Sequence, residues 1–170
     1  AIGDGASPSP WLAHKASAEG IVAAEHIAGH NPPPIDYEKI PGCTYCSPEV
    51  ASVGLTETEA KAEGRQVKVG RFPFRAHGRN IAEGELAGFV KLVGDAETGQ
   101  VLGAHIIGAK ASDLIHECSL AIGADLTLAD LAQAIHAHPT MTEAIGEAAE
   151  DAEGLAIHLM RMEAKTAAKS

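Results

Sequence analysis

The most informative segment of this 170-residue chain reads His136-Ala137-His138-Pro139-Thr140-Met141-Thr142-Glu143. Proline is favoured at the first helical position, so the segment predicts a helix that begins at Pro139, with His138 at its entrance and Glu143 about one turn inside. A carboxylate at that point can accept a hydrogen bond from one imidazole nitrogen and leave the other nitrogen free for proton transfer. His138 and Glu143 are therefore a candidate general acid–base pair. A helix entrance with a solvated glutamate is the simpler alternative.

The regions around this segment predict an α+β fold. Upstream, short apolar stretches are separated by turn residues, and Thr56-Glu57-Thr58-Glu59 has the spacing of a capping box that opens a short helix ended by Gly64. Towards the C-terminus, apolar residues recur at helical spacing. Strands followed by helices favour a mostly antiparallel sheet with the helices packed on one side. We expect strands at 40–46, 50–54, 66–74, 89–93 and 101–107, helices at 112–122 and 128–135, and a loop and helix over 138–149.

The first part of the chain is predicted to be a separate unit. Apolar residues recur at helical spacing over 11–28, Gly29 is suited to end that helix, and Asn31-Pro32-Pro33-Pro34 cannot continue it. We therefore place a domain boundary near residue 38, which divides the chain into residues 1–38 and 39–170. The last residues, 162–170, are polar and rich in Ala and Lys, and we expect a loose tail there.

Composition limits the classes of function. A net charge of −10 argues against nucleic acid or an anionic membrane surface as a partner. No apolar run reaches the roughly 18 residues that a membrane span needs, and the start of the chain lacks the basic region of a signal peptide. The chain has three cysteines, an odd number, which argues against a secreted disulfide framework. We therefore expect a reducing, cytoplasmic compartment.

Two short patterns contain metal-binding residue types, and neither is complete. His136-Ala137-His138 offers two imidazoles, but zinc needs a third and a fourth ligand, and the neighbouring sequence offers no obvious pair. Cys43-Thr44-Tyr45-Cys46 is a single CxxC pair, and in an extended strand residues three apart face opposite sides. We therefore predict no metal site, a supporting role for His136, and packing roles for Cys43 and Cys46.

The segment around His138 resembles the HPTxxE signature of the FAD-dependent pyridine nucleotide-disulfide oxidoreductases. Further stretches resemble the same family in the same order, so that the resemblance covers residues 1 to about 160. These stretches are Ala1-Ile2-Gly3-Asp4, Trp11-Leu12-Ala13-His14-Lys15, Tyr45–Ala51, Phe72-Pro73-Phe74 and Gly154–His158. The resemblance implies the interface (dimerisation) domain of such a reductase, preceded by the C-terminal end of its FAD-binding domain. Within the family, the members that oxidise dihydrolipoyl groups are most similar.

The resemblance also implies roles for individual residues. His138 is the base that takes a proton from the dithiol substrate, and Glu143 orients its ring. Asp4 is the residue that hydrogen-bonds the ribityl chain of FAD. A second segment has its backbone along the flavin at a helix N-terminus and comprises Trp11, Leu12, Ala13 and His14. NAD is the other cofactor that the resemblance implies for the complete enzyme.

The same resemblance implies partners. Two copies would form a homodimer, in which the histidine of one copy reaches the flavin of the other, and the remaining FAD and NAD domains would complete each site. The whole enzyme would serve the lipoyl domains of 2-oxoacid dehydrogenase or glycine cleavage complexes. The chain has neither a GxGxxG loop nor the family's redox cysteine pair, so we expect it to be inactive alone. A catalytically silent dimerisation module and a related enzyme such as a glutathione reductase are the alternatives.

Overall fold

The computed structural model describes residues 1–6 and 10–159, so the predicted tail at 162–170 lies outside the described residues. The strands are β1 (Gly42–Thr44), β2 (Val50–Gly54), β3 (Val67–Pro73), β4 (Gly88–Asp95) and β5 (Val101–Gly108). The α-helices are α1 (Ala13–Ile27), α2 (Glu57–Ala62), α3 (Gly78–Glu83), α4 (Ala111–Gly123), α5 (Leu128–Gln133) and α6 (Glu143–Glu153). Short 3-10 helices are η1 (Gly3–Gly5), η2 (Tyr37–Lys39) and η3 (Phe74–Ala76).

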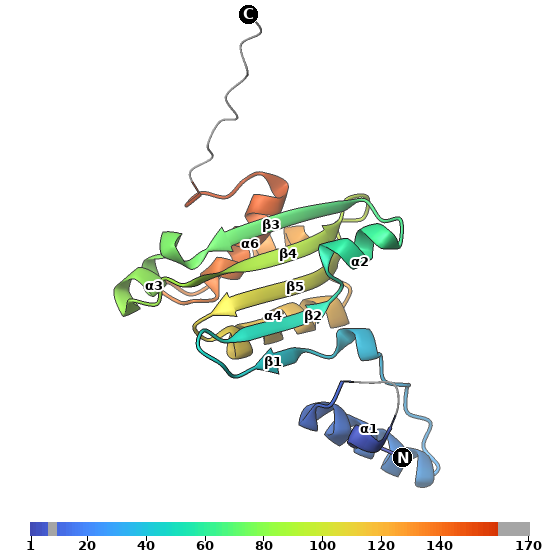
Figure 1. The fold of residues 1–170 in the computed structure, drawn as a ribbon. Coiled ribbons are helices and arrows are strands. Elements are labelled where there is room, and N and C mark those ends of the chain that lie inside the picture. The colour runs from blue at the N-terminus through green and yellow to red at the C-terminus, as the bar shows by residue number, and fades with distance from the viewer. Residues whose placement is uncertain (7–9, 160–170) are drawn as a thin grey trace, which may run out of the picture.

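The five strands form one antiparallel sheet with the order β1-β2-β5-β4-β3 (Figure 1). A tight turn joins β4 to β5, two of the strands that the sequence predicts. The Asp95 carboxylate accepts the N–H groups of Glu97 and Thr98 at 2.9 and 3.0 Å. Gly99 follows with a φ of +77°, which a glycine adopts without strain. The predicted α+β fold with an antiparallel sheet is confirmed.

The main hydrophobic core lies between one face of the sheet and the helices α4, α5 and α6. Successive strand residues point to opposite faces, so alternate residues of the central strands face these helices. Val90 and Leu92 of β4 and Ala104 and Ile106 of β5 are all fully buried there. These three helices therefore lie on one side of the sheet, as predicted, and Figure 1 shows α4 and α6 behind the strands.

Helix α2 covers part of the other face of the sheet. The predicted capping box is present at its start, because Thr56 Oγ1 accepts the Glu59 N–H at 3.2 Å and Glu59 Oε2 accepts the Thr56 N–H at 2.8 Å. The apolar side of this short helix then packs on the strands, where Ala60 is buried against Val93 and Leu102. A small second cluster thus lies opposite the main core.

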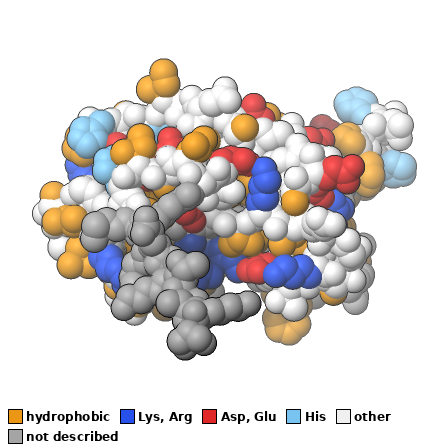
Figure 2. All heavy atoms as spheres, turned by 90° about the horizontal axis from the view of Figure 1, so that it is seen from above, with side chains coloured by type: hydrophobic (Ala, Val, Ile, Leu, Met, Phe, Trp, Pro, Cys, Tyr) orange, Lys and Arg blue, Asp and Glu red, His pale blue; other side chains and the backbone are white. Residues whose placement is uncertain are grey.

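Charged side chains of both signs are interspersed over the face seen in Figure 2. Several of the chain's charges are paired. The Glu57 carboxylate accepts hydrogen bonds from the ammonium groups of Lys61 at 2.6 Å and Lys91 at 2.7 Å. Lys68 Nζ lies 2.9 Å from Glu153 Oε2, a bond that ties α6 to the edge strand β3. Among residues 1–6 and 10–159, no helix has the length and apolar character needed to cross a membrane.

A buried ion pair holds η1 against α1. Lys15 is 1% exposed, and its Nζ lies 3.2 Å from Glu19 Oε1 and donates to the Gly3 carbonyl at 2.8 Å. Glu19 in turn accepts the Gly3 N–H at 2.6 Å and the Tyr37 hydroxyl at 2.9 Å. Both buried charges therefore have an ion-pair partner and further hydrogen bonds, which offset the cost of removing them from water. The domain boundary near residue 38 stays a prediction.

Candidate active site

The segment around His138 is a loop between α5 and α6, because α6 begins only at Glu143. The Thr140 N–H donates to Glu143 Oε2 at 2.8 Å, and the Thr140 hydroxyl donates to the Ala137 carbonyl at 2.6 Å. The prediction that the helix begins at Pro139 is wrong. These side-chain bonds close a turn in the place where the first helical turn would otherwise form.

His138 and Glu143 nevertheless form a hydrogen-bonded pair. Nδ1 of His138 lies 2.8 Å from Oε1 of Glu143. The side chain of His138 is 79% exposed, whereas that of Glu143 is 24% exposed. A ring that is bonded to a carboxylate through Nδ1 carries its hydrogen there and presents Nε2 as the proton acceptor. The loop therefore offers an oriented base at the surface of the chain.

The carboxylate of Glu143 is kept charged by its neighbours. Partial burial raises the pKa of Glu143, but hydrogen bonds from His138 and the Thr140 N–H, with the charges of His138 and His77, lower it below its ordinary value overall. A charged carboxylate is the form that stabilises an imidazolium ring. The pair can therefore take up and release a proton at His138 while Glu143 stays ionised.

The pair borders a surface cavity of about 400 Å³. Its walls come from η3, α3, the end of α5, the following loop and α6, so segments far apart in the sequence meet there. Small and apolar side chains form part of the lining. The titratable side chains that line it are His77, His136, His138, Glu143, Glu147, Glu150 and His158.

Two further histidines of this cavity are bonded to carboxylates. His136 Nε2 lies 2.7 Å from Glu117 Oε1 of α4, and this hydrogen bond raises the pKa of His136. His158 Nδ1 is bonded to Glu147 of α6, and this bond raises the pKa of His158. Burial and the charge of Glu147 raise the pKa of Glu150. The predicted supporting role of His136 agrees with its bond to α4.

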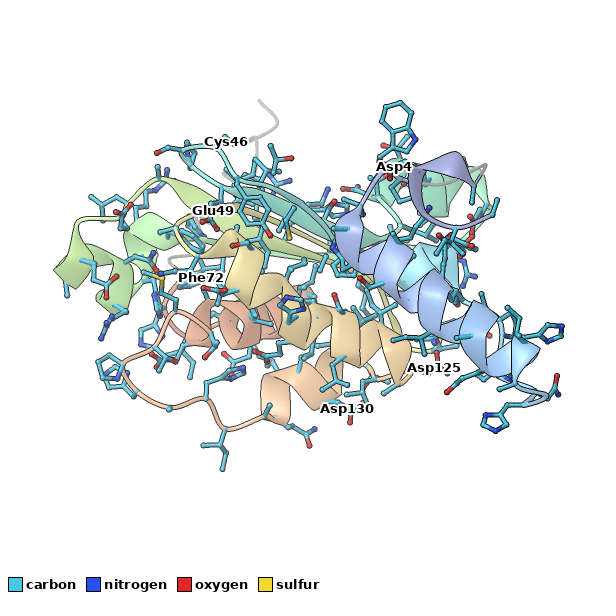
Figure 3. The ribbon with its side chains drawn as sticks, turned by 90° about the horizontal axis from the view of Figure 1, so that it is seen from below. Asp4, Cys46, Glu49, Phe72, Asp125 and Asp130 are labelled. Carbon is cyan, nitrogen blue, oxygen red and sulfur yellow. The ribbon has the colours of Figure 1, made fainter. Side chains whose placement is uncertain are left out.

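The residues predicted to contact FAD gather around the N-terminus of α1. Asp4 is exposed on η1, which packs beside α1 (Figure 3). Trp11 is 78% exposed, and Leu12 stands at the helix cap without a side-chain hydrogen bond to the first turn. His14 Nε2 lies 2.8 Å from the Pro41 carbonyl oxygen. Uncapped N–H groups at a helix N-terminus suit an electron-rich group.

These residues lie far from the acid–base pair within one copy of the chain. Figures 1 and 3 both place α1 at one end of the molecule and the loop between α5 and α6 towards the other end, near α3. The structure therefore brings His138 together with Glu143, and Asp4 together with the start of α1. It does not bring the two sets together in a single copy.

The three cysteines, Cys43, Cys46 and Cys118, are free thiols. Cys43 packs half-buried against the main core, which confirms its predicted packing role. The same prediction is wrong for Cys46, because the connection between β1 and β2 carries its side chain to the surface (Figure 3). In the described part of the chain, no group of three or more His, Cys, Asp or Glu side chains is arranged to hold a metal ion.

One residue of the site has no signal in the local sequence. His77 Nε2 lies 3.7 Å from Glu143 Oε2, although the two residues are distant along the chain. The fold places the end of β3 beside the start of α6, and the residues that follow η3 therefore reach the carboxylate. Spacing along the sequence cannot predict such a contact.

The fold and the site together define a class: an α+β domain whose open antiparallel sheet supports a helical layer with an exposed histidine–glutamate pair. Residues 40–149 match the family described as pyridine nucleotide-disulphide oxidoreductase, dimerisation domain. The chain therefore belongs to this family. The resemblance inferred from the sequence motifs is confirmed.

Individual relatives are similar over most of this chain. Dihydrolipoyl dehydrogenase of Bacillus subtilis is 56% identical over 147 residues, which are 86% of this chain and 31% of that protein. Dihydrolipoyl dehydrogenase of Halobacterium salinarum is 52% identical over 160 residues, or 94% of this chain and 33% of that protein. The crystal structure of LpdA from Mycobacterium tuberculosis matches 88% of this chain and 32% of its own with a TM-score of 0.81 and 29% identity. The chain thus spans about a third of the length of these relatives.

Proposed function

We propose that this chain is the part of a dihydrolipoyl dehydrogenase that supplies the acid–base pair and the dimer interface. The observation that carries the proposal is the 2.8 Å hydrogen bond between His138 Nδ1 and Glu143 Oε1, which leaves the outer edge of the ring exposed. Relatives named dihydrolipoyl dehydrogenase, at 52% and 56% identity, support the substrate class. The complete enzyme would oxidise dihydrolipoyl groups with FAD and NAD.

His138 acts as the base in this proposal. Its Nε2 takes the proton of a substrate thiol, whose ordinary pKa of about 8.5 keeps it mostly protonated at neutral pH. The electron pair of the broken S–H bond stays on sulfur, and the thiolate becomes the nucleophile. Glu143 stabilises the resulting imidazolium through the hydrogen on Nδ1. In the reverse direction, His138 returns the proton to the thiolate.

Asp4 and the start of α1 are the residues of this chain that would hold FAD. The exposed Asp4 carboxylate can accept a hydrogen bond from a ribityl hydroxyl. The first turn of α1 has no side-chain cap, so its N–H groups suit the electron-rich flavin. This segment comprises Trp11, Leu12, Ala13 and His14. FAD supplies a two-electron acceptor when bound. The chain contains no GxGxxG loop, so no residue is assigned to NAD.

The domain division follows the same assignment. Residues 1–38 are proposed as the end of an FAD-binding domain, and residues 39–170 as the interface domain. The lipoyl domains of 2-oxoacid dehydrogenase or glycine cleavage complexes are the proposed protein partners. The cytoplasm is the proposed location.

Dimer formation is supported by apolar side chains beside the cavity. Ile135 is 100% exposed and adjoins the cavity residue His136 in the sequence, and Ile157 is 75% exposed and adjoins the cavity residue His158. Leu155, three residues before His158, is 69% exposed. Large apolar side chains gathered at an exposed site are typical of a protein interface. In a symmetric pair whose interface extends from this region to the start of α1, His138 of one copy would reach the flavin side of the other. That arrangement would supply the contact that a single copy lacks.

The test is a substitution of His138 by Gln in the complete reductase. We expect NADH formation from dihydrolipoamide to fall by about 10²-fold or more, because the base is lost. His105→Gln is the matched control, since His105 faces the other side of the sheet and is bonded to the Leu55 carbonyl at 3.2 Å. An unchanged rate for the His138 variant would contradict the proposal. Activity with glutathione disulfide in place of lipoamide would favour a related reductase.

The second candidate is a dimerisation module without its own activity. The missing dinucleotide loop favours it for the 170-residue chain alone. Sedimentation of the purified chain together with its visible absorption spectrum distinguishes the candidates. A dimer without a flavin band and without lipoamide-dependent NADH formation would favour the silent module, whereas activity of the chain alone would contradict it.

A further inference from the structure

We propose that His77 is a positioning residue for the acid–base pair and holds the Glu143 carboxylate from its buried side. The inference rests on the proposed function of His138 and Glu143 and adds a third residue to it. His77 directly precedes α3 and is 6% exposed, whereas the side chain of His138 is 79% exposed. The Glu143 carboxylate thus has one imidazole ring on its solvent side and one in the interior.

The two oxygens of Glu143 have different partners. Oε1 lies 2.8 Å from His138 Nδ1. Oε2 accepts the Thr140 N–H at 2.8 Å and lies 3.7 Å from His77 Nε2. A rotation of the carboxylate that released His138 would also break the bond from the Thr140 N–H to Oε2. Thr140 and His77 thus lie at the oxygen of Glu143 that does not bond His138, where they can fix the orientation of the carboxylate.

Asn80 determines which nitrogen of His77 carries a hydrogen. Asn80 is fully buried, and its amide nitrogen donates to the Glu85 carbonyl at 3.1 Å. This bond orients the amide, so its oxygen faces Nδ1 of His77 at 2.6 Å. An amide oxygen can only accept, so Nδ1 of His77 carries the hydrogen. The edge-to-face contact with Phe72, with ring centroids 6.1 Å apart, holds the ring in the same place.

The other nitrogen of His77 faces the carboxylate. When Nε2 is protonated as well, the ring is a cation 3.7 Å from Glu143 Oε2, and an opposite charge at this distance favours the ionised carboxylate. Burial raises the pKa of Glu143, and the charge of His77 is one of the interactions that lower it. The other titratable groups that line this cavity are His136, His138, Glu147, Glu150 and His158. His77 is the one of them that contacts Glu143 from the interior.

Nuclear magnetic resonance on the full 170-residue chain tests the proposal without an activity readout. The ¹³C signal of the Glu143 carboxylate reports its titration, which is compared in wild type, His77→Gln and the matched control His105→Gln. Loss of the neighbouring cation should raise the titration midpoint of Glu143 by about 0.5 to 1 pH unit, and the control should leave it unchanged. An unchanged midpoint in a folded His77→Gln chain would overturn the proposal.

The wild-type chain gives a second test, which does not depend on the folding of a variant. The ¹⁵N shifts of an imidazole distinguish a protonated nitrogen from a bare one. At alkaline pH we expect the hydrogen of His77 on Nδ1, and we expect its Nε2 signal to move as Glu143 titrates. A His77 ring with its hydrogen on Nε2, or an Nε2 signal that ignores Glu143, would overturn the proposal.

The two proposals fail in different ways. Dihydrolipoamide oxidation by the complete reductase tests the proposed function, and the Glu143 titration tests the role of His77. If the Glu143 titration responds to His77 but the complete reductase does not oxidise dihydrolipoamide, the proposed function is contradicted and the positioning role is not. An active reductase without that coupling would contradict the positioning role.

Discussion

Replacing Gly70 by Ala is expected to push helix α6 away from the sheet. Gly70 lies in the middle of β3, opposite Leu92 of β4. A Cβ atom at this position would lie 1.7 Å from the Ala148 carbonyl oxygen and 2.8 Å from the Ala152 nitrogen. Both are backbone atoms of α6 and are the acceptor and donor positions of one helical turn. Neither atom can turn aside without breaking the helix.

The size of the effect follows from these distances. Atoms in ordinary contact are about 3.5 Å apart, so α6 would have to retreat by roughly 2 Å at this point. Forcing an additional carbon into a packed core typically costs up to about 3 kcal/mol and occasionally more. Here the whole displacement falls on backbone atoms, so we expect a loss of at least about 3 kcal/mol in the free energy of unfolding.

Urea unfolding followed by circular dichroism measures this loss. With a urea dependence of about 2 kcal/mol per M, a loss of 3 kcal/mol lowers the midpoint by about 1.5 M. Gly123→Ala is the matched control, because a Cβ atom at the end of α4 meets nothing within 4 Å, and Ala favours the helix. Its midpoint should stay or rise. A Gly70→Ala midpoint within about 0.3 M of wild type would contradict the described packing of α6 on β3.

Three further results are expected. Burial raises the pKa of the Cys118 thiol to about 12, so mass spectrometry after alkylation near pH 8 should find label on exposed Cys46 first and on Cys118 only after unfolding. Bonds from two lysines lower the pKa of Glu57 from 4.5 to about 2, so its charge should stabilise the fold above pH 4.5 and lose this effect as the pH falls towards 2. The difference in urea midpoint between wild type and Glu57→Gln should shrink over that range, and a constant difference would contradict the assignment. The bond to Glu117 raises the pKa of His136 above 6.5, so its stabilisation is complete below pH 6.5 and is lost as the pH rises through the folded-state pKa. Glu117→Gln should therefore approach wild-type stability only at alkaline pH.

The sequence predicts those features whose causes are local. The capping box at Thr56 and the helical spacing over 11–28 each depend on residues a few positions apart, and both the capping box and the helix α1 are present. His138 and Glu143 also lie five residues apart, so their contact could be expected from the segment itself. The predicted start of α6 is wrong, because the side chains of Thr140 and Glu143 form hydrogen bonds to the backbone that compete with helix formation.

Features that depend on contacts between distant segments could not be predicted in this way. The closeness of β3 to α6 at Gly70 and the approach of His77 to Glu143 arise only when the sheet and helices have assembled. The burial of Lys15 is a further example. A lysine in a helix is expected to be exposed to solvent, and only the assembled structure shows the partners that allow it to be buried. The hydrophobic pattern of the sequence predicts which face of each helix or strand is buried, but it does not predict how the helices and strands pack against one another.

The loop that carries His138 is held by hydrogen bonds that the chain makes within itself. Thr140 is bonded to Ala137 and to Glu143, and Glu143 is bonded to the imidazole ring. Immobilising a side chain with several rotamers costs roughly 0.5 to 1.5 kcal/mol when it happens during association. For His138 this loss of rotational entropy occurs when the chain folds. A molecule that later binds at Nε2 therefore meets a ring that already has its orientation. The binding free energy of that molecule is not reduced by the cost of immobilising the His138 side chain.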